Sequence, residues 1–136
     1  MASGAVFDAI KTYLTANWVT TPIRFENEPF ELDGPFVDVE MTGTFYGQMS
    51  IGASRQQDNR WDEEGVLWLH ALVPINTGGS VVRTHAKQLA DLFKGTKLLN
   101  ESLEFRDAFI GRGQAGFEDG MYFRISTYIN WRRMDA

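Results

Sequence analysis

The stretch Gly65–Gly95 joins a strand pattern, a glycine-containing turn and a helix pattern in one run of sequence. Val66–Ile75 is almost continuously apolar, has the length of one buried strand and ends at a turn signal. In Ser80–Lys94, apolar residues recur at steps of four, three and four, so they share one helix face. These residues are Val82, Ala86, Leu89 and Phe93. Gly95 predicts the helix end, and the whole unit predicts one half of a hydrophobic core.

The remaining segments predict the other half of that core. Ser3–Ala16 forms a helix pattern in which Phe7, Ile10 and Leu14 share one face. Short or alternating strand patterns occur at Ile23–Phe25, Phe36–Met41, Phe45–Ile51, Ser102–Ile110 and Met121–Trp131. The segment 36–51 fits either two antiparallel strands or one long bent ribbon. We therefore predict an α+β fold, a mostly antiparallel sheet with two helices packed against it, as a single domain over residues 1–136.

Three segments are predicted to be loops or turns: the acidic Glu26–Pro35, the polar Ser54–Glu64 and the glycine-rich Gly111–Gly120. Long polar loops between strands are commonly functional or mobile. Trp61 either folds back onto the sheet or anchors a partner, because tryptophan is enriched in binding hot spots. The tail Arg132–Ala136 is expected to be short and to end the domain.

The acidic balance of the chain argues against some classes of partner. Its 136 residues carry a net charge of -5 and no run rich in lysine or arginine. A nucleic-acid-binding protein normally shows a basic face, so we do not expect this class. No stretch reaches the roughly 18 consecutive apolar residues of a membrane span, and the N-terminus lacks the basic region of a signal peptide. The absence of cysteine excludes disulfides and thiolate metal sites and suits a reducing compartment.

The chain contains fragments of dinucleotide-, phosphate- and metal-binding motifs, but each lacks a required part. The G-x-G-x-x-G pattern in Gly111–Gly116 binds a dinucleotide only when a helix follows, and here a strand is expected. The turn Thr77–Ser80 lacks the lysine of a phosphate-binding loop. His70 and His85 are the only histidines, and no matched carboxylate lies near them in sequence, so they make a poor metal set. We therefore predict no catalytic, cofactor-binding or metal-binding residues.

Arginine and tryptophan residues in the loops and the last strand are the candidate interface residues. Both residue types are typical interface anchors. The candidates are Arg55, Arg60, Trp61, Arg112, Arg124, Trp131, Arg132 and Arg133. A small acidic α+β domain with long polar loops, edge strands and no recognisable chemistry suits a protein that assembles into something larger.

Three segments, taken in order, carry a resemblance to a known family. They are the N-terminal helix running into NWVTTPIRFENEPF, the segment GVLWLHALVPINTGGSVVRTHAKQLADLF and the ending DGMYFRISTYINWRR. The middle segment combines a glycine, a strand that ends in V-P, a glycine-containing turn and a helix with an L-A-D-x-F-like run. In this order the segments resemble the tail terminator, or tail completion, proteins of long-tailed bacteriophages.

The resemblance implies a structural, non-enzymatic function without cofactors. Such proteins form a homohexameric ring on the head-proximal end of the tail tube, where they stop tube polymerisation and present a surface for head attachment. The implied partners are other copies of the chain, the major tail tube protein and a head–tail connector or stopper protein. DNA passes through the lumen without specific binding. The implied location is the virion tail of a siphovirus or prophage, assembled in the cytoplasm of the bacterial host.

In the family, contacts usually come from sheet edges and long loops, which correspond by position to Ser54–Glu64 and Gly111–Gly120. Two alternatives stay open. Another head–tail joining protein or a tail tube protein shares this layout. A small-ligand-binding domain would need a pocket with convergent polar groups, and His70 and His85 would be the first residues to inspect.

Overall fold

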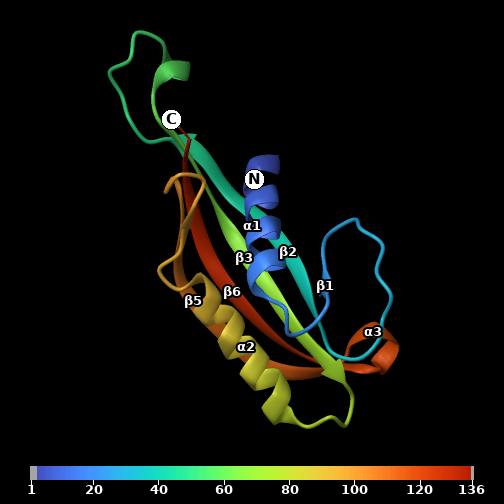
Figure 1. Ribbon diagram of the computed structural model, residues 1–136. Helices are drawn as coiled ribbons and strands as arrows, with labels where there is room; N and C mark the ends of the chain where they lie inside the picture. The colour runs from blue at the N-terminus through green and yellow to red at the C-terminus, as the bar shows by residue number, and fades with distance from the viewer. Residues whose placement is uncertain (1–2, 136) are drawn as a thin grey trace.

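Six strands form one sheet in the order β1-β2-β3-β6-β5-β4, shown in the ribbon of Figure 1. The structure is a computed structural model, and it describes residues 3–135. The elements are α1 (Gly4–Asn17), β1 (Ile23–Arg24), β2 (Phe36–Gln48), the 3-10 turn η1 (Gln56–Asp58), β3 (Trp61–Pro74), α2 (Gly79–Phe93), β4 (Lys97–Leu98), β5 (Leu103–Gly116), α3 (Phe117–Gly120) and β6 (Tyr122–Asp135). All neighbouring strands are antiparallel except β1 and β2. The predicted α+β fold with a mostly antiparallel sheet is confirmed.

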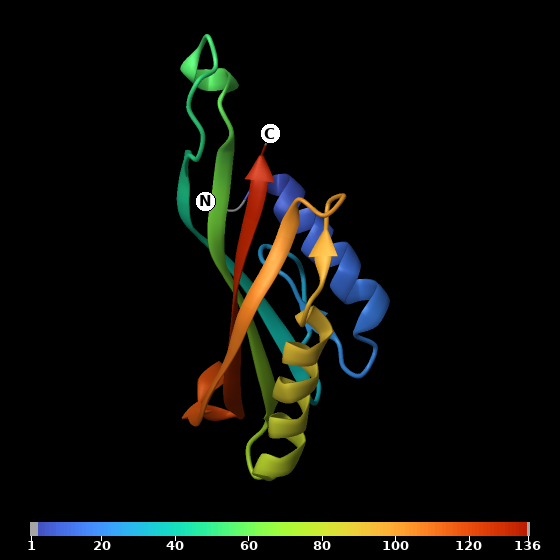
Figure 2. The same ribbon diagram turned by 90° about the vertical axis from the view of Figure 1, so that its left-hand side faces the viewer.

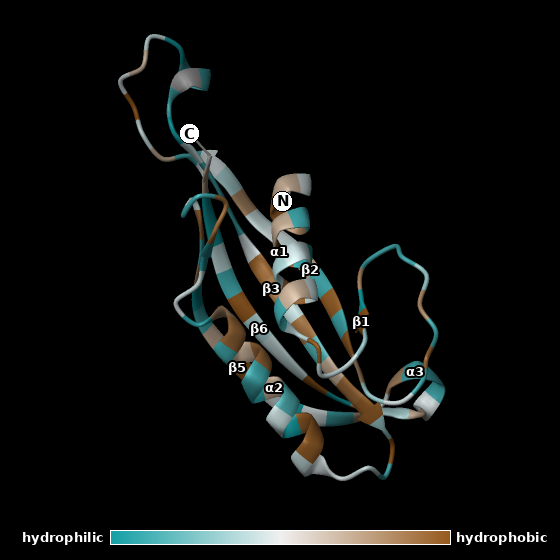
Figure 3. Cartoon of the chain, viewed as in Figure 1, coloured by the Kyte–Doolittle hydropathy of each residue, from teal (hydrophilic) through white to brown (hydrophobic). Residues whose placement is uncertain are grey.

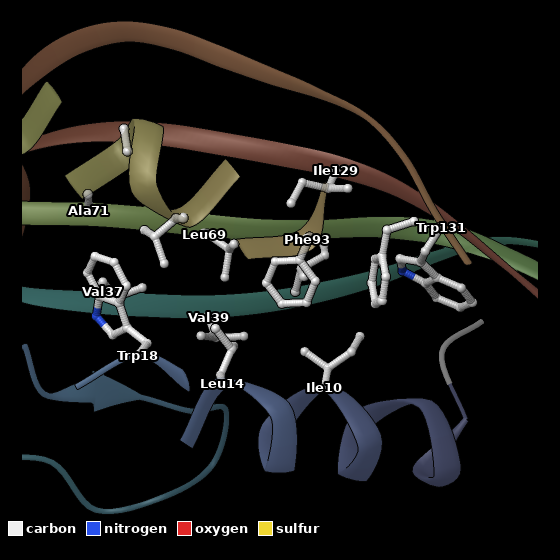
Figure 4. Packing of buried hydrophobic residues seen from close by; sticks show 14 of the residues in the cluster. Ile10, Leu14, Trp18, Val37, Val39, Leu69, Ala71, Phe93, Ile129 and Trp131 are labelled. Carbon is white, nitrogen blue, oxygen red and sulfur yellow. The ribbon is translucent and has the colours of Figure 1, made fainter. Parts of the chain in front are cut away.

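Both long helices cover the same face of the sheet, as the turned view in Figure 2 shows. The predicted apolar face of α2 is fully buried: Val82, Ala86, Leu89 and Phe93. The buried face of α1 consists of Val6, Ile10 and Leu14, so Val6 takes the place expected for Phe7, which packs at the side of the core. Figure 4 shows Ile10 and Leu14 pointing at side chains of the sheet, among them Val39, Leu69 and Ile129. The pattern of Gly65–Gly95 therefore predicted a real strand–helix core unit.

Alternation along the strands follows from this one-sided cover. In Figure 3, hydrophobic and hydrophilic positions alternate along β2 and β6. On β6, Ile125, Ile129 and Trp131 are buried under the helices, while Ser126 and Tyr128 lie on the helix-free face and are partly exposed. A strand with one covered face has this period of two.

Three strands are longer than predicted. β3 begins at Trp61, so the prediction of a loop over Ser54–Glu64 was wrong for its last four residues. β5 runs to Gly116, so Gly111–Gly120 is a turn only from Phe117 onward. The residues 132–135 extend β6 rather than form a tail, while residue 136 lies outside the described residues. β2 is one strand with a register shift between Gly43 and Phe45, which matches the long bent ribbon.

The strand extensions have physical causes that lie outside each segment. The charged residues at the start of β3 face arginines on β6: Glu63 is opposite Arg133, and Glu64 is opposite Arg132. Cross-strand pairs of opposite charge stabilise a sheet. On β5, the phenyl ring of Phe123 lies over Gly113, in the space that a Cβ atom would otherwise occupy. A glycine can therefore occupy this strand position, because the neighbouring aromatic ring makes the packing contacts that its own side chain lacks.

Candidate functional site

The end of the β2–β3 hairpin projects beyond the rest of the molecule, as Figures 1 and 2 show. We define the arm as residues 45–61. It exposes several large apolar side chains: Phe45 (45%), Tyr46 (44%), Met49 (43%) and Ile51 (90%). Trp61 folds back onto the arm itself, with its ring centroid 5.6 Å from that of Tyr46, and its indole N–H donates to the Gln56 carbonyl at 3.3 Å. The arm therefore combines an ordered base with an apolar tip.

Two buried carboxylates form the base of the arm on opposite faces of β3. Asp62 is 0% exposed, and its Oδ2 lies 3.2 Å from Nε of Arg132, while Oδ1 lies 3.3 Å from Nε of Arg60. On the helix-covered face, Glu63 is 2% exposed, lies 3.5 Å from Nη1 of Arg133 and accepts the Ser3 backbone N–H at 3.1 Å. Buried carboxylates are costly unless they are paired. The paired charges therefore fix the direction in which the arm leaves the sheet.

Most of the predicted interface residues gather at the arm. Arg55 and Trp61 lie on it, and Arg60, Arg132 and Arg133 pair with the carboxylates at its base. Arg112 lies on β5 and Arg124 on β6, in another part of the sheet.

Trp131 is a correction to the predicted set. It is 1% exposed and packs in the core under α1, so it presents no surface to a partner. A Cβ atom built on Gly65 would lie 2.5 Å from Cζ2 of its indole ring. Gly65 and Trp131 therefore form one packed pair beside the base of the arm.

Each side of the sheet has a long strand edge with little strand cover. β1 pairs with β2 only at Val37 and Asp38, and β4 pairs with β5 only at Leu103 and Glu104. Within residues 3–135, the outer edges of 39–48 on β2 and 105–116 on β5 lie beside no other strand. One amide on the β2 edge is bound by a side chain, since the Met41 N–H donates to Glu26 at 2.7 Å. Exposed edges are templates for pairing with another chain.

The helix-free face holds a polar cluster around His70. His70 is 5% exposed; its Nδ1 lies 2.7 Å from Oγ of Ser126, and its Nε2 lies 3.2 Å from Oε1 of Glu40. Burial lowers the pKa of His70 below its usual value. Nearby, Arg24 bridges Asp38 at 3.0 Å and Glu118 at 2.9 Å, which raises the pKa of its guanidinium further. Of these residues, Arg24, Asp38, Glu40 and His70 line an open cavity of about 420 Å³.

Arg124, which lines the same cavity, rests 3.7 Å from the ring centroid of Phe117. Burial lowers its pKa. Arg124 therefore lies on the helix-free face, apart from the arm, and its interface role stays a prediction.

The two histidines are not brought together by the fold. His70 lies on the helix-free face, whereas His85 on α2 contacts Trp18 at a centroid distance of 5.8 Å. Within residues 3–135, no group of three or more metal-ligating side chains converges, and no helix is long and apolar enough to cross a membrane. The two histidines therefore do not line a common pocket, so they do not support the ligand-binding alternative as a pair.

The exposed apolar side chains near the end of the arm were not predicted from the sequence. Met49 and Ile51 stand in the otherwise small and polar run QMSIGAS, which local patterns read as the end of a strand. An apolar pair directly before a polar loop was the available signal. The helix-free face also carries an unpredicted aromatic row, in which the ring centroid of Tyr128 lies 5.0 Å from Trp68 and 4.8 Å from Phe109.

Comparisons with known proteins identify the fold. No family model matches the chain, and no curated protein gives a significant match. A solved chain titled as the virion of a native gene transfer agent particle matches with a TM-score of 0.68 and 16% identity, over 98% of each chain. A second solved chain matches with a TM-score of 0.64 and 16% identity, over 95% of this chain and 89% of that one. At this identity the similarity shows a shared fold over nearly the whole chain.

Proposed function

We propose that this chain is a structural virion protein that forms a closed ring at the head-proximal end of a phage-type tail tube. The ring stops further addition of tube subunits and presents a surface for the head connector. The support is twofold. The chain shares its complete fold with a chain from a gene transfer agent virion, and its sheet has two open edges suited to head-to-tail assembly.

The directions of the two edges carry the ring proposal. β2 is antiparallel to β3, β3 to β6 and β6 to β5, so β2 and β5 run in opposite directions at opposite sides of the sheet. Copies related by rotation about an axis along the strands would therefore bring the β5 edge of one beside the β2 edge of the next as an antiparallel pair. Such a contact is heterologous, and it yields a closed ring when the rotation between neighbours closes.

The proposed partners follow from this role. Each copy contacts two others, with six copies as the expected ring size, and the ring contacts the major tail tube protein on one side and a connector or stopper protein on the other. DNA passes through the lumen without a specific site, which the net charge of -5 favours. A tail tube subunit or another head–tail joining protein is the second candidate, because the same two edges would also serve it.

Electron microscopy and native mass spectrometry test the proposal on the purified chain, alone at high concentration and with tube protein. We expect rings of one size and tubes that stop growing when capped at one end. Growth of the chain into tubes of unlimited length would instead identify a tube subunit. Monomers that leave tube growth unchanged would overturn the proposal.

A matched pair of variants tests the edge contact. Ile110 on the β5 edge and Ile75 in the turn after β3 are almost equally exposed, at 46% and 47%. Lysine on an edge strand opposes strand addition, because it places a charge where a second strand would pack. Ile110→Lys should therefore suppress ring formation, while Ile75→Lys should leave it unchanged. Equal assembly of the two variants would exclude the β5 edge as the contact.

A further inference from the structure

We infer that Arg112 on the β5 edge of one copy forms an ion pair with Glu40 on the β2 edge of the next copy. This contact rests on the proposed ring and names the side chains that join its two strand edges. Its occupant is a second copy of this chain, for which charge, position along the strands and free space at the edge all fit.

Glu40 lies on the helix-free face of β2, on the part of the outer edge that is beside no other strand of the described chain. It is opposite Trp68 on β3, which in turn is opposite Tyr128 on the helix-free face of β6. Its side chain is 55% exposed, and its carboxylate lies 3.2 Å from Nε2 of His70. Because burial lowers the pKa of His70, this imidazole is neutral near pH 7 and does not balance the charge of Glu40.

Arg112 lies at a bulge on the opposite edge of the sheet. The register of β5 shifts between Ile110 and Gly113, so Gly111 and Arg112 both lie across from Ser126 of β6. Such a bulge bends the strand and redirects its side chains, and bulges are common beside functional sites. Arg112 is exposed and forms no ion pair with the side chains that the structure describes. The β5 edge therefore presents a cation without a partner in its own copy.

The strand register puts the two residues at nearby levels along the sheet. Asp38 is opposite His70, and His70 is opposite Ser126. Arg112, which lies across from Ser126, is therefore level with Asp38. Glu40 lies two residues further along β2, about 7 Å away by the strand rise, a distance that an extended arginine side chain bridges. Rotation about an axis along the strands preserves these levels, so the ring brings Arg112 of one copy beside Glu40 of the next.

Free space and charge at the β2 edge fit a guanidinium group. The open cavity of about 420 Å³ is lined by Arg24, Phe25, Glu26, Asn27, Glu28, Asp38, Val39, Glu40, His70 and Arg124, which include four carboxylates and two guanidinium groups. Both guanidinium groups have partners. Arg24 bridges Asp38 and Glu118, and Arg124 stacks on the ring of Phe117. A third cation, supplied from outside, therefore suits this cavity.

Glu40 is the carboxylate of the cavity that is open to an incoming cation. Besides the bridged aspartate, Glu28 pairs with Lys11 at 2.8 Å. Glu26 accepts the backbone N–H of Met41 at 2.7 Å. An arginine that enters from the next copy thus meets Glu40 without displacing another partner. Charge pairs across an interface fix its register and disfavour wrong partners, so this pair would set how neighbouring edges align.

Charge reversal tests the pair, because every copy in the ring carries both partners. Arg112→Glu and Glu40→Arg should each raise the concentration needed for ring assembly at least about tenfold, since each places like charges together at every contact. A mixture of the two variants should form rings again, because each supplies the partner that the other needs. These rings should contain both variants in equal number, which native mass spectrometry reads when one variant is isotopically labelled. The double variant Arg112→Glu/Glu40→Arg should form rings alone.

Arg83→Glu is the matched control, because Arg83 is exposed on α2 rather than on a strand edge and the change in net charge is the same. It should change the assembly concentration less than about twofold. Thermal unfolding of each variant as a single chain separates loss of assembly from loss of the fold. If Glu40→Arg lowers the Tm, the neutral variants Glu40→Gln and Arg112→Gln take its place. Combining these two should then weaken rings no more than either alone, as expected for residues that act as a pair.

The outcomes separate this pair from the ring itself. If the unmodified chain forms rings and Arg112→Glu assembles as readily as Arg83→Glu, the pair is overturned and the ring proposal stands. Single variants that fail to assemble and do not recover when mixed would also overturn the pair, because the two residues would then act independently. If the unmodified chain forms rings neither alone nor with tube protein, the ring proposal fails and the pair fails with it.

Discussion

Replacement of Gly65 by alanine should strongly destabilise the fold, although it adds a single methyl group. The new Cβ would lie 2.5 Å from Cζ2 and 2.8 Å from Cε2 of Trp131, and it would also clash with the backbone carbonyl oxygen of Thr42. The carbonyl belongs to the neighbouring strand, and the indole is 1% exposed in the core. Neither neighbour is the free end of a flexible side chain, so strand and ring must both shift.

The expected loss follows from this geometry. Extra volume in a well-packed core typically costs about 1–3 kcal/mol and occasionally more. Because Gly65→Ala meets a rigid ring and a backbone atom together, we expect a loss of about 3 kcal/mol in the free energy of unfolding. For a chain of 136 residues, this corresponds to a decrease in Tm of roughly 10 °C.

Thermal and urea unfolding, followed by circular dichroism and tryptophan fluorescence, measure this loss. Gly111→Ala is the matched control, since its Cβ would lie 3.4 Å from the Ser126 carbonyl oxygen and its strand position needs no left-handed conformation. We expect the control to change the free energy by less than about 1 kcal/mol. A loss for Gly65→Ala below about 1 kcal/mol, or no larger than that of the control, would refute the packing assigned to Trp131.

Three further substitutions probe the base of the arm, the core and the polar face. Glu63→Ala should lower the free energy of unfolding by about 3 kcal/mol, since it leaves Arg133 and the start of α1 without their buried carboxylate, whereas the exposed Glu31→Ala should cost less than about 0.5 kcal/mol. Leu89→Ala should cost about 3 kcal/mol in the same urea unfolding assay. Because burial lowers the pKa of His70, the folded state binds its proton less readily than the unfolded state. Stability should therefore be full above the unfolded pKa of about 6.5 and fall below it, and His70→Gln should reduce that decrease in a Tm series from about pH 8 to about pH 5.

The strand and helix of Gly65–Gly95 were predictable because their sequence signals are local. A continuous apolar run and a helical period each follow from residues within one element, and the fold places Val82 and Leu89 in the core as expected. The extensions of β3 and β6 were not predictable in this way. Asp62 and Glu63 resemble loop residues until the arginines of β6, some seventy positions away, are seen to lie opposite or beside them.

The candidate site was likewise predictable only where the signal lies within one segment of the sequence. Residue type selected Arg60, Arg132 and Arg133 as candidate interface residues, a role that stays a prediction. It could not show that these residues pair with buried carboxylates at the base of a projecting hairpin. Trp131 was misassigned because a surface tryptophan and a core tryptophan at the end of a strand have the same local pattern. Only the glycine opposite it distinguishes them, since Gly65 provides the space for the ring.

The buried ion pairs at the base of the arm are explained if the arm has to keep a fixed direction relative to the sheet. A hairpin end held by hydrogen bonds alone could bend at the register shift after Gly43, and a shift of direction would move the tip far from any fixed target. Asp62 and Glu63 are held on opposite faces of β3, so bending toward either face would separate a buried carboxylate from its arginine. Such an arrangement costs free energy that a simple hydrophobic pair would not, and it leaves a stiff arm with an apolar end.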